Sequence, residues 1–273
     1  MLTELEKNAI RDHYRAISES LPQFRPRAAQ RNMIAAVAQA FSRSKTREEG
    51  EDAPAREGES IAVIEGPTGV GKSLSYLLAG GIMAQSRGKR LIVSSATVAL
   101  QEQLVNRDLP FLVEQSGLEL SFALAKGRGR YLCPYKLYQL TQNHAQANLL
   151  GFEETPTVLW DRKPSQDELA LLHRLSDDFA NRRFNGDRDT WPEKIPDELW
   201  FKVTNDRHSC LKAACPNRAE CPFFLAREVL ETTDVVVANH DLLLADISMG
   251  GGVILPAPEN SFYCIDEAHH LPK

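Results

Sequence analysis

Two short stretches of this chain carry residues whose types and spacing suit phosphate chemistry. The first is the glycine-rich run 66–73, Gly-Pro-Thr-Gly-Val-Gly-Lys-Ser. The second is the acidic pair Asp266 and Glu267, near the other end of the chain. Glycines let the backbone turn tightly, so that successive N–H groups point at one anion, and paired acids can hold a metal ion and polarise a water molecule. Together the two stretches predict a site that binds and hydrolyses a nucleoside triphosphate.

The phosphate loop is predicted to join a strand to a helix. Apolar residues 61–65 precede it and a helical pattern over 74–85 follows it, which is the order that such a loop needs. The start of the helix favours an anion, Lys72 is expected to reach the β- and γ-phosphates, and Ser73 is expected to hold Mg²⁺. The flanking elements disfavour the alternative, a turn with an unrelated lysine. The expected nucleotide-binding residues of the loop are Gly66, Thr68, Gly69, Gly71, Lys72 and Ser73.

The acids Asp266 and Glu267 follow a second apolar strand candidate, residues 262–265. An acid at the end of a buried strand can share Mg²⁺ with Ser73, and its neighbour can polarise the attacking water. Acid pairs are also common on protein surfaces, but a phosphate loop upstream favours catalysis. The predicted catalytic residues are Lys72, Asp266 and Glu267.

Four of the five cysteines could form one thiolate metal site: Cys133, Cys210, Cys215 and Cys221. Four sulfur ligands suit zinc or an iron–sulfur cluster. Structural zinc sites mostly use pairs separated by two residues, and the gaps of four and five residues here fit a larger cubane cluster better. Because three of these cysteines lie within twelve residues, unrelated free thiols explain them poorly. Cys264 lies in an apolar strand and is expected to be a core residue.

Polar residues at two further places could contact a nucleic-acid backbone. Ser95 and Thr97 lie at the end of a short apolar strand candidate, where ligands bind in open α/β sheets, although helix capping explains them equally well. Arg128 and Arg130 alternate with glycines before Tyr131. Such a turn can place guanidinium groups on phosphates and an aromatic ring on a base; an exposed basic turn is the alternative.

The composition is that of an ordinary globular protein of 273 residues with a net charge of −5. This charge gives no overall sign of nucleic-acid binding, so any such surface must be a local basic patch. The sequence shows neither an apolar signal core nor a run as long as a membrane span. We therefore expect a soluble, cytoplasmic protein in which cysteines are ligands or buried thiols.

Apolar spacing along the chain predicts helices that alternate with short buried strands. This alternation indicates an α/β fold, in which helices flank a parallel sheet. Gln30, near the start of one helix, is interpreted from its residue type alone as a solvated side chain. The predicted helices are 2–20, 28–41, 74–85, 96–104 and 223–231, and the predicted strands are 61–65, 91–95, 122–125, 234–240 and 262–265.

Residues 133–221 interrupt the alternation. They contain helix candidates over 136–150 and 166–183 and a stretch over 191–200 rich in proline, tryptophan and acids. We interpret them as an insertion closed at both ends by cysteine ligands. Residues 42–59 have almost no large apolar side chain and are expected to form a flexible surface loop.

Taken in order, these motifs resemble those of the DinG family of iron–sulfur superfamily 2 DNA helicases, relatives of the XPD helicase. The resemblance covers nearly the whole chain, and the order of the motifs around a cysteine-bounded insertion makes it specific. The segments that carry it are 24–30, 65–73, 94–101, 127–134, the cysteines 210, 215 and 221, and the segments 237–240 and 266–269.

The resemblance implies a RecA-like P-loop NTPase lobe over 1–132 and 222–273, with a mostly helical [4Fe-4S] insertion over 133–221. It implies ATP, Mg²⁺ and the cluster as cofactors, and a motor that moves 5′ to 3′ on single-stranded DNA. Such motors unwind duplexes and DNA–RNA hybrids in repair and replication, and the complete protein is expected to be monomeric. By position, Gln30 becomes an adenine-reading residue, the four cysteines become cluster ligands, and the DNA-contact candidates are Ser95, Thr97, Arg128 and Arg130.

The family continues into a second motor lobe that this sequence does not contain. Because that lobe completes the ATP site, we expect the chain to be an N-terminal fragment that is inactive as a helicase alone. Two alternatives remain open: a non-catalytic, cluster-bearing module that binds DNA or a partner, and a zinc-containing phosphate-loop ATPase.

Overall fold

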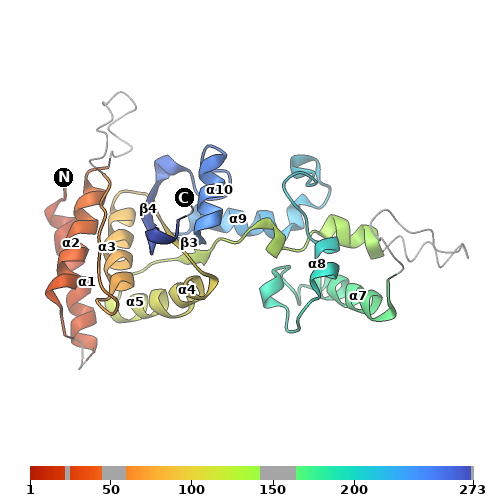
Figure 1. Cartoon of the computed structure of the whole chain (residues 1–273), viewed down its shortest axis with the longest axis horizontal. Helices are drawn as coiled ribbons and strands as arrows, with labels where there is room; N and C mark the ends of the chain where they lie inside the picture. Colours follow the sequence, from red (N-terminus) through yellow and green to blue (C-terminus); the bar gives the residue numbers. More distant parts are fainter. Residues whose placement is uncertain (22–24, 45–59, 142–163, 272–273) are drawn as a thin grey trace, which may run out of the picture. The chain divides into compact units, whose positions relative to one another are not determined.

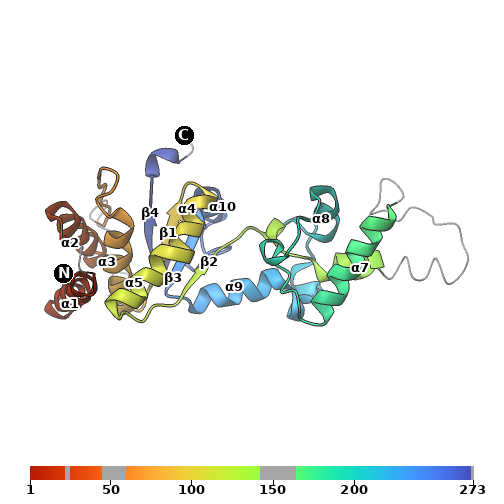
Figure 2. The same cartoon turned by 90° about the horizontal axis from the view of Figure 1, so that it is seen from below.

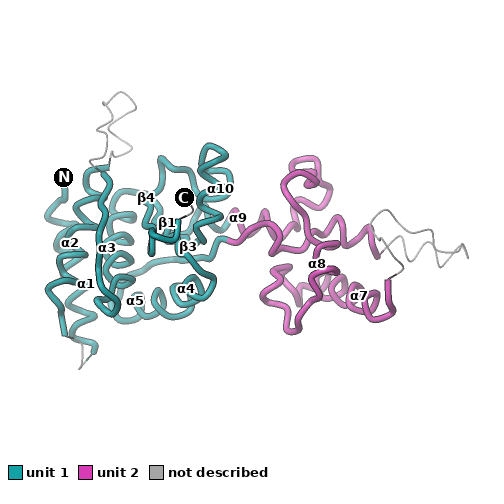
Figure 3. The backbone as a smooth tube through the Cα atoms, in the orientation of Figure 1, with its two compact units in different colours: residues 1–125, 229–273 teal, residues 126–228 magenta. Residues whose placement is uncertain are grey.

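The structure is a computed structural model that describes residues 1–21, 25–44, 60–141 and 164–271. Two compact units make up the chain: residues 1–125 with 229–273, and residues 126–228 (Figure 3). The expected surface loop lies outside the described residues from position 45, and the helix candidate 136–150 does so from position 142.

The first unit is built on a parallel sheet whose strand order is β2-β3-β1-β4 (Figure 1). The central strands β1 and β3 are apolar and buried on both faces, as parallel strands between helices must be. Their register brings the carboxyl ends of the strands to one edge of the sheet, with Ser95 opposite Asn239. This confirms the predicted α/β fold. The strands are β1 Arg90–Ser95, β2 Phe122–Leu124, β3 Val235–Asn239 and β4 Ser261–Ile265.

Helices cover both faces of this sheet (Figure 2). Alternate strand residues such as Val93 and Val237 share one core with α3 and α5, and α1 and α2 pack against α3. Their neighbours, such as Ile92 and Val236, share the opposite core with α10 and the end of α9. The helices are α1 Glu4–Ser20, α2 Ala28–Ser42, α3 Lys72–Ser86, α4 Val98–Gln103, a π-helical turn Leu104–Asp108, α5 Leu109–Ser116, α9 Pro222–Thr232 and α10 His240–Ser248.

The strand predicted over 61–65 is wrong. Residues 61–67 have no regular secondary structure, and no described strand pairs with them. Ile61 and Val63 are 74% and 97% exposed. Apolar residues make a strand only where a neighbour supplies hydrogen-bond partners and a face to pack on. In the described sheet these residues have neither, so their apolar pattern alone misled the prediction.

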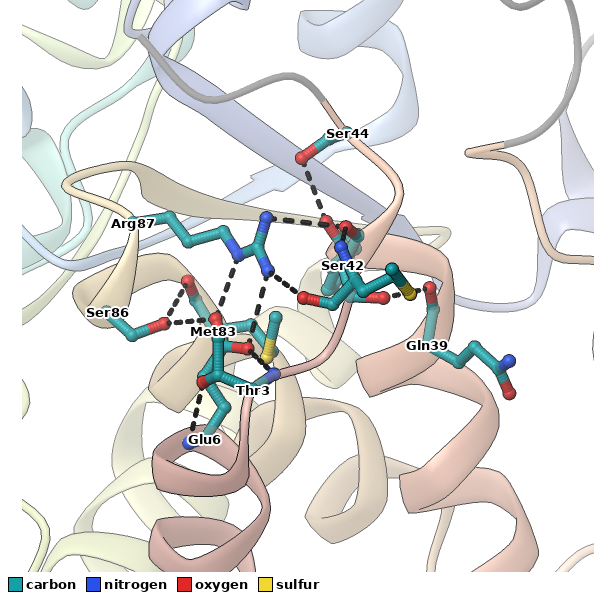
Figure 4. A network of polar contacts seen from close by, with 10 residues as sticks. Thr3, Glu6, Gln39, Ser42, Ser44, Met83, Ser86 and Arg87 are labelled. Carbon is teal, nitrogen blue, oxygen red and sulfur yellow. Dashed lines mark hydrogen bonds and ion pairs between the residues drawn. The ribbon is translucent and has the colours of Figure 1, made fainter. Parts of the chain in front are cut away.

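A buried ion pair fastens α1 to the far end of α3 (Figure 4). Arg87 Nε donates to Glu6 Oε1 at 2.9 Å, and the Thr3 backbone N–H donates to Glu6 Oε2 at 2.8 Å. Arg87 also donates to the Ser42 carbonyl at 3.3 Å, so the same guanidinium holds the end of α2. Since α3 begins at the phosphate loop, this network anchors the helix that carries the loop.

The Glu6–Arg87 pair predicts a pH-dependent contribution to stability. Burial raises the pKa of the Glu6 carboxyl, but hydrogen bonds from Arg87 and Thr3 outweigh burial and leave the pKa below its ordinary value. A carboxyl with a depressed folded-state pKa stabilises the fold fully above its unfolded pKa, about 4.3, and loses this contribution as pH falls through the folded value. We expect Glu6→Gln to lower the free energy of unfolding by about 3 kcal/mol near neutral pH, and by less in acid.

Urea unfolding of the wild type and Glu6→Gln near neutral pH and near pH 3.5 measures this difference. Glu4→Gln is the matched control, because Glu4 lies in the same helical turn and its ion pair with Lys7 is at the surface. A Glu6→Gln cost that is the same at both pH values would contradict the role of the ion pair.

The second unit, residues 126–228, has a core of its own. The helix predicted over 166–183 is confirmed as α7, Gln166–Ala180, and a capping box at Ser165 begins it. Helix α8, Asp197–Val203, was not predicted; it buries Trp200, whose Nε1 donates to the Gly129 carbonyl at 2.6 Å. The buried core residues are Leu132, Leu137, Leu140, Leu172, Leu175, Phe184, Trp191, Ile195, Leu199, Trp200 and Val203.

Candidate nucleotide and cysteine sites

The phosphate loop turns through two glycines with left-handed backbone angles. Gly69 and Gly71 have φ values of +78° and +88°, and Gly71 caps α3. A Cβ on Gly71 would also collide with the side-chain amide of Gln30. Glycine is therefore required at this position both by its conformation and by the close approach of Gln30. The Arg27 guanidinium donates to the Gly69 carbonyl and braces the loop from the other side.

Gln30 is not the solvated side chain that its residue type suggested. It is 4% exposed, and Tyr14 Oη donates to its Oε1 at 2.8 Å. Helices α1 and α2 thus hold the amide against the phosphate loop. The exposure of a single glutamine depends on the helix packed beside it, and one residue type gives no sign of that.

Lys72 and Glu267 meet although they lie 195 positions apart in the sequence: the Lys72 Nζ to Glu267 Oε1 distance is 2.5 Å. The hydrogen bond with Glu267 raises the pKa of Lys72, and the same bond lowers the pKa of Glu267. Both groups are therefore held in their charged forms. Glu267 has a φ of +53°, which is uncommon for a residue with a side chain and occurs mainly where a site imposes it.

Asp266 is held on three sides. Its backbone N–H donates to the Ser94 carbonyl at 2.8 Å, which extends the pairing of β4 with β1. Its Oδ1 accepts the Glu267 N–H at 3.1 Å, and its Oδ2 accepts the Tyr76 hydroxyl at 3.1 Å. Because Tyr76 and Ser73 both lie on α3, the structure brings the loop helix and the predicted metal-binding acid together. Sequence analysis missed Tyr76, since it looks like an ordinary apolar position of a buried helix.

The four predicted cysteine ligands line one pocket in the second unit. Cys133 follows an antiparallel bridge between Leu132 and Thr204, and its N–H donates to the Val203 carbonyl at 2.6 Å. The two short gaps are closed by 3₁₀ turns, Lys212–Ala214 and Arg218–Glu220, each of which ends at the next cysteine. This local folding explains how gaps of four and five residues return the chain to the same pocket.

Several groups in the pocket favour sulfur in its charged form. Arg128 Nη1 donates to Cys210 Sγ at 3.1 Å, and its guanidinium stacks 3.8 Å from the Phe223 ring centroid. Cys133 and Cys221 each precede the first turn of a helix, where the helix dipole favours negative charge. Burial raises the pKa of the Cys221 thiol, and the nearby Cys133 and Cys210 raise it further. A cationic metal centre would relieve this mutual repulsion.

Among the described residues, no three His, Cys, Asp or Glu side chains converge on the position of one metal ion. The sulfurs surround a pocket instead of meeting at a point, which fits a multi-iron cluster better than a single zinc ion. The fifth cysteine, Cys264, is separate: it packs partly buried against the core of the first unit, and burial raises the pKa of its thiol.

Comparison with known proteins gives a consistent family. Residues 194–273 match the DEAD_2 family. The chain is 43% identical, over all of its 273 residues, to a protein from Photobacterium profundum named ATP-dependent DNA helicase DinG. It is 41% identical, over 99% of its length, to the protein of that name from Escherichia coli K12. The chain corresponds to the N-terminal region of the DinG family. It spans 37% and 35% of the lengths of these two relatives, about a third of each.

The residues predicted to contact DNA in this DinG-family chain differ in their surroundings. Thr97 is exposed and caps α4, accepting the Leu100 N–H at 3.3 Å. Ser95 is fully buried, and within the described chain its hydroxyl has no hydrogen-bond partner. Arg128 faces the cysteine pocket, and Arg130 pairs with Asp189. The DNA contacts therefore stay predictions, and the basic turn has less free charge than its sequence suggests.

None of the helices in the described ranges is long and apolar enough to cross a membrane.

Proposed function

We propose that this chain is the ATP-binding first motor lobe, with its iron–sulfur insertion, of an ATP-dependent DNA helicase. One observation carries the proposal: the phosphate-loop lysine and the acid predicted to activate water, far apart in sequence, are in contact. This is the arrangement that hydrolysis of a γ-phosphate requires. The names of the related proteins agree with it.

In the proposed nucleotide site each residue has a separate task. The loop N–H groups and Lys72 bind the phosphates, Ser73 and Asp266 hold Mg²⁺, and Glu267 orients and deprotonates the attacking water. The ion pair of Lys72 with Glu267 supports this, because the γ-phosphate would take over Lys72 and leave Glu267 facing the water. Gln30 is proposed to read the adenine, with its amide preset by the hydroxyl of Tyr14.

In the second unit we propose a [4Fe-4S] cluster with Cys133, Cys210, Cys215 and Cys221 as ligands. When bound, the cluster would cross-link the segments of a unit whose hydrophobic core is small, as structural metal centres do. The hydrogen bond from Arg128 to Cys210 supports the proposal, since donors to sulfur stabilise the charge of a thiolate-bound cluster. A zinc site is the competing hypothesis, and metal analysis separates the two.

The remaining assignments follow from the proposed family function. The motor lobe would comprise 1–132 and 222–273, and the insertion 133–221. The motor would act in the cytoplasm as a monomer and move 5′ to 3′ on single-stranded DNA, unwinding duplexes and DNA–RNA hybrids. Ser95, Thr97, Arg128 and Arg130 are the proposed DNA contacts, and Thr97 is favoured among them because its side chain is exposed.

The test of the proposed function is strand displacement by the complete protein, including the second motor lobe. Duplexes with a single-stranded tail at either the 5′ or the 3′ end of the loading strand are mixed with protein, Mg²⁺ and ATP. We expect ATP-dependent unwinding of the 5′-tailed duplex and little unwinding of the 3′-tailed one. Nucleotide hydrolysis with no displacement of either duplex would instead favour the ATPase alternative.

A further inference from the structure

Tyr76 is the one buried tyrosine at the phosphate-loop end of the described α3, and the predicted chemistry assigns it no task. It is 5% exposed, and its ring lies in the main core of the first unit. Its hydroxyl leaves that core and donates to Asp266 Oδ2 at 3.1 Å. Burial and the charge of Asp266 raise the pKa of Tyr76 well above its ordinary value, so the phenol stays a donor.

The position of Tyr76 on α3 explains how it reaches the site. It lies three residues after Ser73 and four after Lys72, so the three side chains share one face of the helix. A hydrogen bond with Ser73 also contributes at the Tyr76 hydroxyl. The hydroxyl therefore touches both of the side chains that the proposed function gives to Mg²⁺.

The Asp266 carboxylate needs such a support. Its Oδ1 is held by the Glu267 N–H, and its backbone is held by the pairing of β4 with β1. Its Oδ2 accepts from Tyr76. Removing this donor would let the carboxylate rotate about its side-chain bonds, and carboxylates that hold metals depend on partners of this kind for their orientation.

We propose that Tyr76 is a positioning residue for the magnesium site, whose hydroxyl orients Asp266 toward Ser73 so that both oxygen ligands face one Mg²⁺ ion. The inference rests on the proposed nucleotide site. The alternative, that Tyr76 only fills the core, assigns a role to the ring and none to the hydroxyl. Tyr76→Phe separates the two, because it keeps the ring and removes the hydrogen bond.

The experiment measures binding of a fluorescent ADP analogue to the 273-residue chain, first in EDTA and then as Mg²⁺ is titrated. For Tyr76→Phe we expect unchanged affinity in EDTA and a 10- to 100-fold higher Mg²⁺ concentration at half-effect, the usual loss when a ligand's hydrogen-bond partner is removed. Ser73→Ala should shift the Mg²⁺ titration in the same direction. Tyr263→Phe, on the strand that leads to Asp266, is the matched control and should behave as the wild type.

Each result has a defined meaning. An unchanged Mg²⁺ titration for Tyr76→Phe would overturn the inference, and so would equal weakening with and without Mg²⁺, which indicates a distorted loop. Electron paramagnetic resonance of Mn²⁺ bound with ADP gives a second readout that does not depend on turnover. Failure of the wild type to bind nucleotide under either condition would instead overturn the proposed site, and with it the role of Tyr76.

Discussion

Cys210→Ser is expected to remove the metal centre from the second unit and to unfold much of that unit. Wild-type protein purified without oxygen should be brown and contain about four iron and four sulfide per chain, whereas the variant should retain well below one iron. The pocket would keep three sulfurs, and a serine hydroxyl is a poor replacement for a thiolate on iron. Because metal binding contributes directly to folding, the variant should also melt at a lower temperature.

The matched control is Cys264→Ala, which removes a thiol from the first unit and leaves the pocket intact. Its iron and sulfide content should equal that of the wild type. Colorimetric iron and sulfide assays with mass-spectrometric metal analysis provide the readout. One zinc per wild-type chain with no iron would contradict the cluster and favour the zinc hypothesis.

Lys72→Ala is expected to abolish detectable hydrolysis of ATP by the complete protein and to weaken nucleotide binding strongly. The substitution removes the only side-chain cation that the structure places against Glu267 within the described nucleotide site. Loss of one preorganised charge in such a site typically costs about 10²- to 10³-fold in rate. Removal of the ion pair also leaves Glu267 without its partner, so the pKa of Glu267 should rise toward its ordinary value.

Lys7→Ala is a suitable control for this variant, because Lys7 is a surface lysine that pairs only locally with Glu4 in the described structure. Steady-state hydrolysis and equilibrium binding of a fluorescent nucleotide are measured for both variants. Hydrolysis by Lys72→Ala within a fewfold of the wild type would mean that the catalytic site lies elsewhere.

Most of the fold could be predicted from the sequence because local patterns and tertiary structure agree there. The periodicity of α1, α2 and α7 matches the faces that they bury, and the apolar strands β1 and β3 lie in the middle of a parallel sheet. Helix α10 was missed although a signal was present: Asn239 caps it by accepting the Leu242 N–H at 2.7 Å. An asparagine before an apolar run is a usual start of a helix.

The parts that could not be predicted depend on contacts between distant segments. The apolar run 61–65 looked buried, but no described strand pairs with it. Gln30 looked solvated, but Tyr14 and Gly71 enclose its amide. Arg128 looked available to a phosphate backbone, but it faces Cys210 and Phe223. Residue type and spacing identify a candidate, whereas its partners are known only once the chain is folded.

The loop and the acids could be assigned from sequence order, but their mutual support could not. The contact of Lys72 with Glu267 and the support of Asp266 by Tyr76 join segments about 190 residues apart. Those contacts turn two separate motifs into one candidate site for ATP and Mg²⁺.

The most direct test of this function is ATP hydrolysis by the complete protein, measured at steady state with and without single-stranded DNA. Hydrolysis should be slow alone, should rise at least tenfold with DNA, and should be absent with or without DNA in Lys72→Ala, as for a motor whose turnover depends on its track. A wild-type rate that does not respond to DNA, or a DNA-stimulated rate that persists in Lys72→Ala, would contradict the proposed DNA motor.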